Sequence, residues 1–320
     1  MKWLAALIAP VAFGVAHAVE LDIPVDCEIG QGCYIQSYAD RDPGPGAVDY
    51  ACNPMSYDGH KGVDFRVPTF RALKEGVDIL AAAPGVVKGT RNGEPDTGVD
   101  GMTKGRDCGN GLVIDHGDGW VTQYCHLERG SLRVRSGDRV QTGDRLGRMG
   151  FSGRTEFPHL HLSVRKDDVP IDPFDARANN ESCTLNDDAS LWSPAARALL
   201  TYVPGGAVDA GFAPQAPKLA DIRIGDFYEK PTADAPILAF WARFYGLRDG
   251  DIIRMRLQRP GGKVLAQKDV TIPGDKAEYF HFLGGRKPTQ GWPLGDYHGT
   301  AVLLRAGKII DKIAEKATVK

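Results

Sequence analysis

The chain has 320 residues, which is long enough for two domains that each bury a core. Its formal net charge of −2 at pH 7 and its hydrophobic content of 42% are ordinary for a globular protein. The sequence shows neither the basic excess of a nucleic-acid-binding protein nor an acidic tail, so we expect no nucleic-acid partner.

Residues 1–18 resemble a cleavable signal peptide. Lys2 supplies the positive start, an apolar segment follows, and Ala16-His17-Ala18 fits an A-x-A cleavage site. The apolar segment is too short and too interrupted for a transmembrane span, and no cysteine follows the cleavage site as a lipoprotein would require. We therefore expect a mature protein that begins near Val19 and is periplasmic or secreted.

Six cysteines fit an exported protein, because disulfides persist in oxidising compartments. Their spacing favours a small closed loop, a stapled hairpin and one link between the ends of the first domain. The expected pairs are Cys27–Cys33, Cys108–Cys125 and Cys52–Cys183. A zinc site made by cysteines is the weaker alternative, since the chain contains no Cys-x-x-Cys pair.

Residues 19–50 are polar and rich in glycine and proline, which predicts an irregular arm on the domain that follows. Next, His60 and Asp64 lie four residues apart with Gly62 between them. Glycines and β-branched neighbours indicate a loop that leads into a strand and argue against a helix. Such a loop can bring an imidazole and a carboxylate to one metal, but on this segment alone a glycine turn with two exposed polar residues is the better interpretation.

Short strands separated by glycine turns continue to residue 174 and predict a compact all-β domain over residues 51–180. The clearest hairpin joins residues 111–116 to residues 120–127 through Gly117-Asp118-Gly119. Residues 91–110 are polar and rich in glycine and aspartate, so we expect a long surface insertion there.

His159 and His161 stand in an alternating segment, residues 157–164. Side chains two residues apart in a strand point to the same face, so the two imidazoles should project side by side. The pair suits a metal ligand and a catalytic neighbour, although a lone His-x-His is more often a surface pair.

A helix is expected over residues 189–203, with Pro194 in its first turn, where proline is tolerated. Residues 211–218 contain two prolines and predict a linker, so residues 181–218 are assigned to a short helix and a Pro-rich linker. Residues 219–320 then form a second β unit, for which an immunoglobulin-like sandwich is expected.

In this second unit, His281 and His298 have no acidic or cysteine partners at ligand spacing and are interpreted as ordinary residues. Trp241 lies in an apolar segment and is expected to pack in the core. A carbohydrate-binding role for Trp241 or Trp292, or a cell-wall or protein ligand for this unit, is the alternative.

The first β domain thus offers five candidate site residues, His60, Asp64, His126, His159 and His161. A catalytic zinc takes three protein ligands and leaves one position for water. His60, Asp64 and one histidine of the 159/161 pair satisfy that number, and the other histidines could orient the water and stabilise an oxyanion. The number alone does not say which histidines bind metal.

Three segments resemble the signature blocks of the lysostaphin/LytM-type zinc metallopeptidases, in the same order: Gly59-His60-Lys61-Gly62-Val63-Asp64, Tyr124-Cys125-His126-Leu127 and His159-Leu160-His161. The resemblance covers roughly residues 51–175 and does not reach the C-terminal unit. It implies a mostly β fold, the duplicated hybrid motif with an open groove. It also implies one Zn²⁺ per chain bound by His60, Asp64 and His161, with His126 and His159 as the catalytic histidines.

The activity implied by the resemblance is endopeptidase cleavage of stem or bridge peptides in peptidoglycan. No signature position is substituted, which argues against the metal-free activators of cell-wall amidases. A secreted protease that acts on protein substrates stays open. A biotinyl or lipoyl carrier is set aside, because residues 147–150 lack the required lysine.

Two features depart from the family's pattern and leave groove width and substrate choice open: the insertion at residues 91–110 and the Cys108/Cys125 pair. His116 matches a common position that is not a ligand, so it is interpreted as structural. The signal peptide and the cysteines fit a Gram-negative periplasm. That location favours D-alanyl–diaminopimelate cross-links over glycine bridges.

Overall fold

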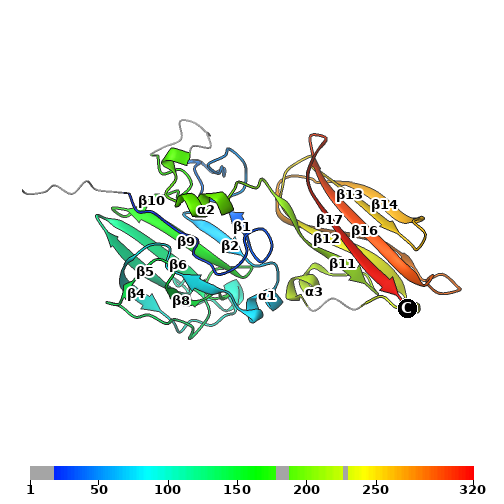
Figure 1. The fold of residues 1–320 in the computed structure, drawn as a ribbon, viewed down its shortest axis with the longest axis horizontal. Coiled ribbons are helices and arrows are strands. Elements are labelled where there is room, and N and C mark those ends of the chain that lie inside the picture. Colours follow the sequence, from blue (N-terminus) through cyan, green and yellow to red (C-terminus); the bar gives the residue numbers. More distant parts are fainter. Residues whose placement is uncertain (1–17, 178–186, 226–229) are drawn as a thin grey trace, which may run out of the picture.

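The computed structural model describes residues 18–177, 187–225 and 230–320, and it shows a mostly β protein with two lobes (Figure 1). Strands β1 to β10 lie in the N-terminal lobe, residues 18–203, and strands β11 to β17 lie in the C-terminal lobe, residues 204–320. The expected β class is confirmed. The predicted signal peptide, residues 1–18, lies outside the described residues except for Ala18.

The N-terminal lobe is built on an antiparallel sheet with the strand order β1-β2-β9-β6-β5-β4-β7, and β10 pairs with β9. A separate two-stranded sheet is formed by β3 and β8. The strands are β1 (Tyr34–Ser37), β2 (Val63–Arg66), β3 (Asp78–Leu80), β4 (Gly85–Arg91), β5 (Asn110–Gly117), β6 (Trp120–Leu127), β7 (Arg139–Val140), β8 (Arg145–Arg148), β9 (His159–Lys166) and β10 (Val169–Ile171). Its short helices are α1 (Phe70–Glu75), η1 (Gly98–Gly101), η2 (Asp187–Ala189) and α2 (Pro194–Leu199).

Strand β9 shows why this sheet has two different faces. Leu160, Leu162 and Val164 are fully buried in the core of the lobe. Because side chains alternate along a strand, His159 and His161 lie on the opposite face. One face of the sheet therefore holds the core, and the other carries imidazoles.

The arm, residues 19–50, is more ordered than its composition predicts. Leu21 and Val25 are buried in the core of the lobe, and β1 forms the edge of the main sheet beside β2. Its apolar residues are spaced too irregularly to give a strand pattern, so the sequence missed this contribution.

The helix expected over residues 189–203 is shorter, because α2 spans only Pro194–Leu199. Pro194 stands in the first turn, as expected, and the Ser193 side chain caps the helix by accepting from the Ala196 amide. Upstream, the backbone of Leu191 and Ser193 is bonded to Leu21 of the arm. This pairing uses the peptide groups that a longer helix would need.

The linker expected over residues 211–218 overlaps a strand. β11 (Gly206–Ala213) pairs with β12, so the C-terminal lobe begins before residue 219. Glycine and alanine dominate β11, and these residues have weak strand propensity. A helix that the sequence did not predict, α3 (Leu219–Ile224), follows the strand.

The C-terminal lobe contains two antiparallel sheets, β11-β12-β15 and β14-β13-β16-β17, which share one apolar core. Its other strands are β12 (Ile237–Leu247), β13 (Ile252–Gln258), β14 (Val264–Thr271), β15 (Lys276–Arg286), β16 (Gly295–Arg305) and β17 (Lys308–Val319). Trp241 is buried, as expected, but in a small cluster with Ile222 of α3. A sandwich is confirmed, and its immunoglobulin-like character stays a prediction.

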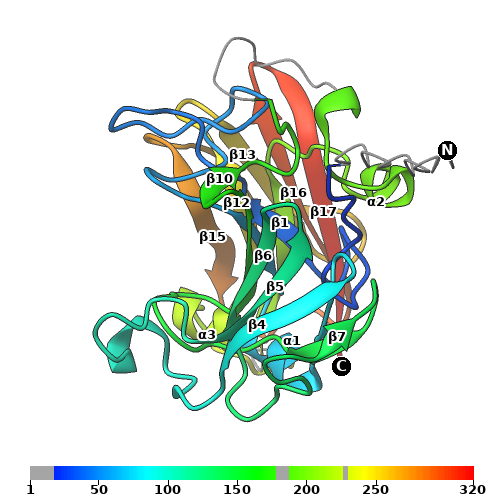
Figure 2. The same cartoon turned by 90° about the vertical axis from the view of Figure 1, so that its left-hand side faces the viewer.

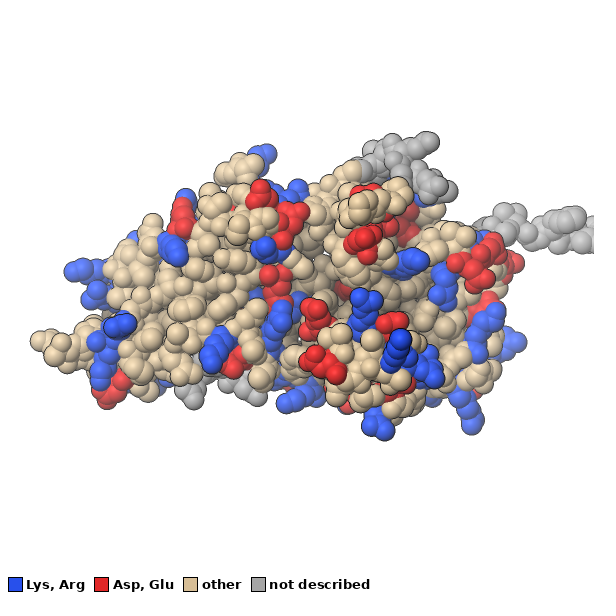
Figure 3. Space-filling model, turned by 180° about the vertical axis from the view of Figure 1, so that it is seen from behind, with Lys and Arg blue, Asp and Glu red and all other residues tan. Residues whose placement is uncertain are grey.

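The two lobes lie side by side in space, and strands β1 and β2 of the N-terminal lobe are close to β12 and β15 of the C-terminal lobe (Figures 1 and 2). Acidic and basic side chains are interspersed over the face seen in Figure 3. In the part of the chain that the structure describes, no helix is both long and apolar enough to cross a bilayer.

Candidate active site

Three neighbouring strands bring the candidate side chains together. In the register of β2 and β9, Asp64 stands opposite His161. In the register of β6 and β9, Cys125 stands opposite His161, so His126 follows one residue later. The loop before β2 adds His60. Segments about a hundred residues apart in the sequence therefore meet on one sheet face.

His60, Asp64 and His161 present three ligand atoms at the corners of a small triangle. His60 Nε2 lies 3.1 Å from Asp64 Oδ1 and 3.1 Å from His161 Nδ1, and His161 Nδ1 lies 2.9 Å from Asp64 Oδ1. Zinc binds nitrogen and carboxylate oxygen at about 2.0–2.2 Å, so a single ion can reach all three atoms. Among the described residues this is the group of three that can hold a metal ion.

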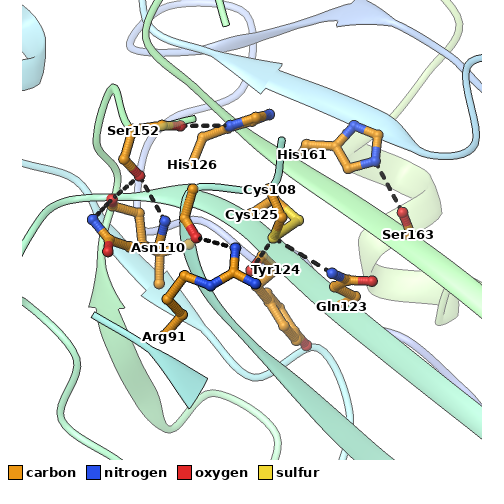
Figure 4. The surroundings of a disulfide bond; sticks show 12 residues. Arg91, Cys108, Asn110, Gln123, Tyr124, Cys125, His126, Ser152, His161 and Ser163 are labelled. Atoms are coloured by element: carbon orange, nitrogen blue, oxygen red, sulfur yellow. Dashed lines mark hydrogen bonds between the residues drawn. A yellow bond between two sulfur atoms is a disulfide. The ribbon is translucent and has the colours of Figure 1, made fainter. Parts of the chain in front are cut away.

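Hydrogen bonds on the far sides of the two imidazoles select the tautomers that a metal requires. His60 Nδ1 lies 2.6 Å from the Tyr38 carbonyl oxygen, so we assign a proton to Nδ1 and a lone pair to Nε2. His161 Nε2 lies 2.9 Å from Ser163 Oγ and donates to it when Nδ1 is the ligand (Figure 4). Such outer partners fix ring orientation at metal sites.

Gly62 lets the loop approach the site closely. A Cβ atom at this position would lie 2.5 Å from the Leu162 carbonyl oxygen and 2.8 Å from the ring of His161. Any side chain there would displace the imidazole of His161, so glycine is required between His60 and Asp64.

His126 and His159, the expected catalytic pair, both lie beside this triangle. Their ring centroids are 4.6 Å apart, and His159 Nε2 lies 3.4 Å from Asp64 Oδ1. His126 Nδ1 lies 2.8 Å from the Ser152 carbonyl oxygen (Figure 4). A carbonyl only accepts, so we assign the proton of the neutral ring to Nδ1 and leave Nε2 free.

The ring of His159 is oriented in the same way. Thr155 Oγ1 donates its single hydrogen to the Phe157 carbonyl oxygen at 2.6 Å, and His159 Nδ1 faces both oxygens at 3.1 and 3.0 Å. Nδ1 must therefore carry a proton. Like His126, His159 keeps Nε2 for chemistry.

The backbone and the protonation state of His126 are both unusual. Its φ of 66° lies in the left-handed region, which costs free energy for a residue with a side chain. The Cys108 carbonyl accepts from the His126 amide at 2.9 Å and helps to hold this conformation. Burial, with His159 and His161 nearby, lowers the pKa of His126 well below its ordinary value, so the ring is neutral near pH 7.

The carboxylate of Asp64 is ionised although it is buried. Burial raises its pKa, but the neighbouring imidazoles of His60 and His159 outweigh this effect, and the net pKa lies well below the ordinary value. Once His60 and His161 are deprotonated, this buried carboxylate and the two imidazole nitrogens form a donor set whose negative charge a divalent cation compensates.

The five residues lie in or beside a groove with a cavity of about 760 Å³. One wall comes from residues 57–59, another from residues 154–157, and the third from Val99, Asp107 and Cys108 of the insertion. The insertion therefore shapes the groove as well as the surface. No residue in the described part of the arm, 18–50, lines this cavity.

The Cys108–Cys125 disulfide forms part of the groove wall next to His126, and Cys27–Cys33 closes a loop in the arm. Both pairs were expected from the sequence. The third expected pair includes Cys183, which lies outside the described residues. Figure 4 shows the groove disulfide with Gln123 and Tyr124 around its sulfur atoms.

The remaining histidines lie elsewhere. His116 is bonded through Nδ1 to the Pro84 carbonyl at 2.7 Å and through Nε2 to Thr122 Oγ1 at 2.8 Å, which agrees with a structural role. His281 and His298 stand on β15 and β16 in the C-terminal lobe.

Sequence reasoning missed the groups that orient the site. The carbonyl oxygens of Tyr38 and Ser152 carry no residue-specific signal, because every residue has one. Ser163 could have been found, since it is the next same-face position after His161 in the alternating strand.

Comparison with known proteins gives the following similarities. Residues 58–173 match the model of peptidase family M23. The chain is 32% identical over 117 residues to the peptidoglycan DD-endopeptidase ShyA of Vibrio cholerae, covering 37% of this chain and 23% of ShyA. It is 30% identical over 118 residues to the cell division protein DipM of Caulobacter vibrioides, covering 35% and 16%. It is 28% identical over 134 residues to the DD-carboxypeptidase/endopeptidase Mpg of Neisseria meningitidis, covering 41% and 26%. The similarity thus spans about a quarter or less of each relative's own length.

Proposed function

From the match of residues 58–173 to peptidase family M23, we propose that the chain is an exported zinc endopeptidase of peptidoglycan. The substrate is a peptide cross-link or bridge between glycan strands. The observation that carries the proposal is the triangle of His60 Nε2, Asp64 Oδ1 and His161 Nδ1, with His126 and His159 beside it in one groove.

The donor set fits zinc because it combines two neutral imidazole nitrogens with one carboxylate oxygen. Bound zinc lowers the pKa of its water to about 7 and polarises a carbonyl group. His60, Asp64 and His161 would hold the ion, and Tyr38 and Ser163 fix the rings of His60 and His161.

The two catalytic histidines handle the protons. The neutral ring of His126 offers Nε2 as the acceptor for a proton from the attacking water. His159 Nε2 lies 3.4 Å from Asp64 Oδ1, beside the three ligand atoms, so in its protonated form His159 can donate to the developing oxyanion or to the leaving amine. Each ring is held through Nδ1 and lines the groove, which leaves Nε2 available for proton transfer.

The names of the relatives support one class of bond. ShyA is named a DD-endopeptidase and Mpg a DD-carboxypeptidase/endopeptidase. We therefore assign the D-alanyl–diaminopimelate cross-link as the substrate in place of a glycine bridge. Export to the periplasm places the enzyme where this polymer lies, and amino-terminal sequencing of the mature protein should begin near Val19.

Digestion of purified Gram-negative sacculi tests the activity. The zinc-loaded protein should release monomeric muropeptides from cross-linked dimers, identified by mass, and a chelator should stop the release until zinc is restored. Absence of chelator-sensitive products from any wall type, in a protein that purifies without zinc, would favour the amidase-activator alternative. Cleavage of an unrelated protein such as casein in place of sacculi would favour the secreted-protease alternative.

A further inference from the structure

The C-terminal lobe contacts the N-terminal lobe through a buried ionic network. Glu278 of β15 accepts from Arg66 of β2 at 2.9 Å, from Arg243 of β12 at 3.1 Å and from Arg223 of α3 at 2.8 Å. The side chains of Arg66 and Glu278 are 2% and 7% exposed, respectively. One carboxylate from the C-terminal lobe thus compensates the buried charge of Arg66 in the N-terminal lobe.

Arg66 has three directional contacts. Its Nη2 donates to Glu278 and its Nη1 donates to Gln36 Oε1 at 2.8 Å. The flat guanidinium lies over the ring of Phe157, with Cζ 4.4 Å from the ring centroid. A buried cation needs such partners, and the cation–ring contact strengthens when water is excluded.

Phe157 connects Arg66 to the active site. It lines the groove, and its ring centroid lies 4.7 Å from that of His159. The carbonyl of the same residue accepts from the Nδ1 atom of His159. Arg66 also stands opposite His159 in the pairing of β2 with β9. A shift of Arg66 would therefore reach His159 through both the ring and the backbone of Phe157.

We infer that the C-terminal lobe positions the catalytic histidine His159: Glu278 fixes Arg66, Arg66 fixes Phe157, and Phe157 orients the imidazole. This inference rests on the proposed function, because it treats His159 as the catalytic group. Glu278, Arg66 and Phe157 are positioning residues, and none of them is a metal ligand.

Steady-state kinetics on a purified cross-linked muropeptide dimer test the coupling. Glu278→Gln and Phe157→Leu should each lower kcat about tenfold to a hundredfold, because misplacement of a catalytic group reduces the chemical step, with KM and zinc content nearly unchanged. The double variant should be no slower than the slower single variant, since both changes interrupt one route. Losses that multiply in the double variant would overturn the inference.

Two further variants separate positioning from folding. Arg66→Lys keeps a positive charge for Glu278 but loses the flat surface over Phe157, so it should lower kcat by a similar factor while the protein stays folded. Asp251→Asn is the matched control, because it removes another buried carboxylate of the C-terminal lobe, one paired with Arg305 at 2.8 Å. An equal loss of kcat in this control would reduce the network to a purely stabilising role.

Side-chain NMR of the zinc-loaded protein gives a readout that needs no activity. The imidazole signals of His159, assigned with His159→Gln, should shift in Glu278→Gln and Phe157→Leu, whereas those of His60 and His161 stay in place. Unchanged His159 signals would contradict the coupling. An inactive wild-type protein whose His159 signals still respond would refute the proposed function and leave the coupling intact.

Discussion

The two lobes differ in how deeply the polar side chains on their sheets are buried. In the C-terminal lobe, β13 alternates buried and exposed side chains, and its outward Arg254 pairs with Asp269 at the surface. In the N-terminal lobe, the face opposite the core is polar and yet buried, with Asp64 and His159 only 1% and 4% exposed. Burial of polar groups costs free energy unless they are bonded.

This difference in burial marks the sheet of the N-terminal lobe as the one that carries the candidate site. Surface pairs such as Arg254–Asp269 contribute little to stability. The buried histidines, by contrast, are each held by a carbonyl or hydroxyl oxygen, and such arrangements recur at active sites. The C-terminal lobe also holds a buried carboxylate that faces the other lobe, that of Glu278.

Removal of a metal ligand gives the largest expected contrast between the lobes. His161→Ala should lose zinc and reduce cleavage of sacculi by more than about a hundredfold, because a ligand contributes more than the outer groups that orient it. His298→Ala, at an exposed position on β16, should leave both unchanged. Zinc content by mass spectrometry and muropeptide release measure the two effects. Full zinc occupancy in His161→Ala would exclude this residue as a ligand.

Removal of a proton acceptor should separate metal binding from catalysis. His126→Ala is expected to keep one zinc per chain and to lose about 10²- to 10⁴-fold in kcat, the usual contribution of a general acid or base. The same kinetic and metal assays apply. Full activity with stoichiometric zinc would refute the role of His126.

The two described disulfides differ in their distance from the candidate site, because Cys108–Cys125 lines the groove and Cys27–Cys33 lies in the arm. Replacing Cys108 and Cys125 by serine opens a loop of 17 residues, which should cost about 3 kcal/mol in the free energy of unfolding. It should also reduce activity, because Cys125 precedes His126 in its left-handed conformation. Replacing Cys27 and Cys33, which lie in the arm, is the control.

Denaturant titration and the sacculus assay distinguish the two pairs. The control should lower stability without lowering the activity of the folded protein. Equal activity in both double-serine variants would show that the groove disulfide has no influence on His126.

The pH dependence of stability tests the buried contact between the lobes. Burial raises the pKa of Glu278, but Arg66, Arg223 and Arg243 outweigh it and lower the pKa to about 2, against an ordinary value of 4.5. A lowered carboxyl pKa contributes stability that is complete above pH 4.5 and is lost as the pH falls towards 2. The shift corresponds to at most about 3 kcal/mol.

Urea denaturation of the wild type and Glu278→Gln between pH 5 and pH 2 measures this contribution. The wild type should lose stability more steeply than the variant over this interval. Asp269→Asn, which breaks the exposed pair with Arg254, should follow the wild-type slope. Parallel slopes for Glu278→Gln and the wild type would show that Glu278 is not held ionised by its neighbours.

The smallest expected effect concerns the outer partner of a ligand. Ser163→Ala removes the hydroxyl that holds His161 Nε2, so zinc affinity should fall about 10- to 100-fold. Ser136→Ala, which removes an exposed hydroxyl bonded to the Lys88 carbonyl, should not change it. Competition with a chromophoric chelator measures both affinities, and equal values would contradict the orienting role of Ser163.

Local sequence patterns predicted the features that depend on local periodicity. The alternation of residues 157–164 correctly placed His159 and His161 on one face, and the spacing of cysteines gave both described disulfides. The resemblance of three short segments identified the residues that the fold then brings together.

Features that depend on distant backbone contacts were not predictable. The helix after residue 189 is short because Leu191 pairs with Leu21, and β11 was missed because its glycines and alanines acquire strand structure from β12. Arg66 and Glu278 are separated by 212 residues, and nothing near either of them in the sequence indicates the other.

The location of bound zinc tests the central claim most directly. Crystals of the purified protein, measured on both sides of the zinc absorption edge, should give one anomalous peak per chain in contact with His60, Asp64 and His161. The peak should disappear in His161→Ala and persist in His126→Ala. A wild-type protein without zinc, or with zinc at other residues such as His281 or His298, would contradict the assignment of this face as a metallopeptidase site.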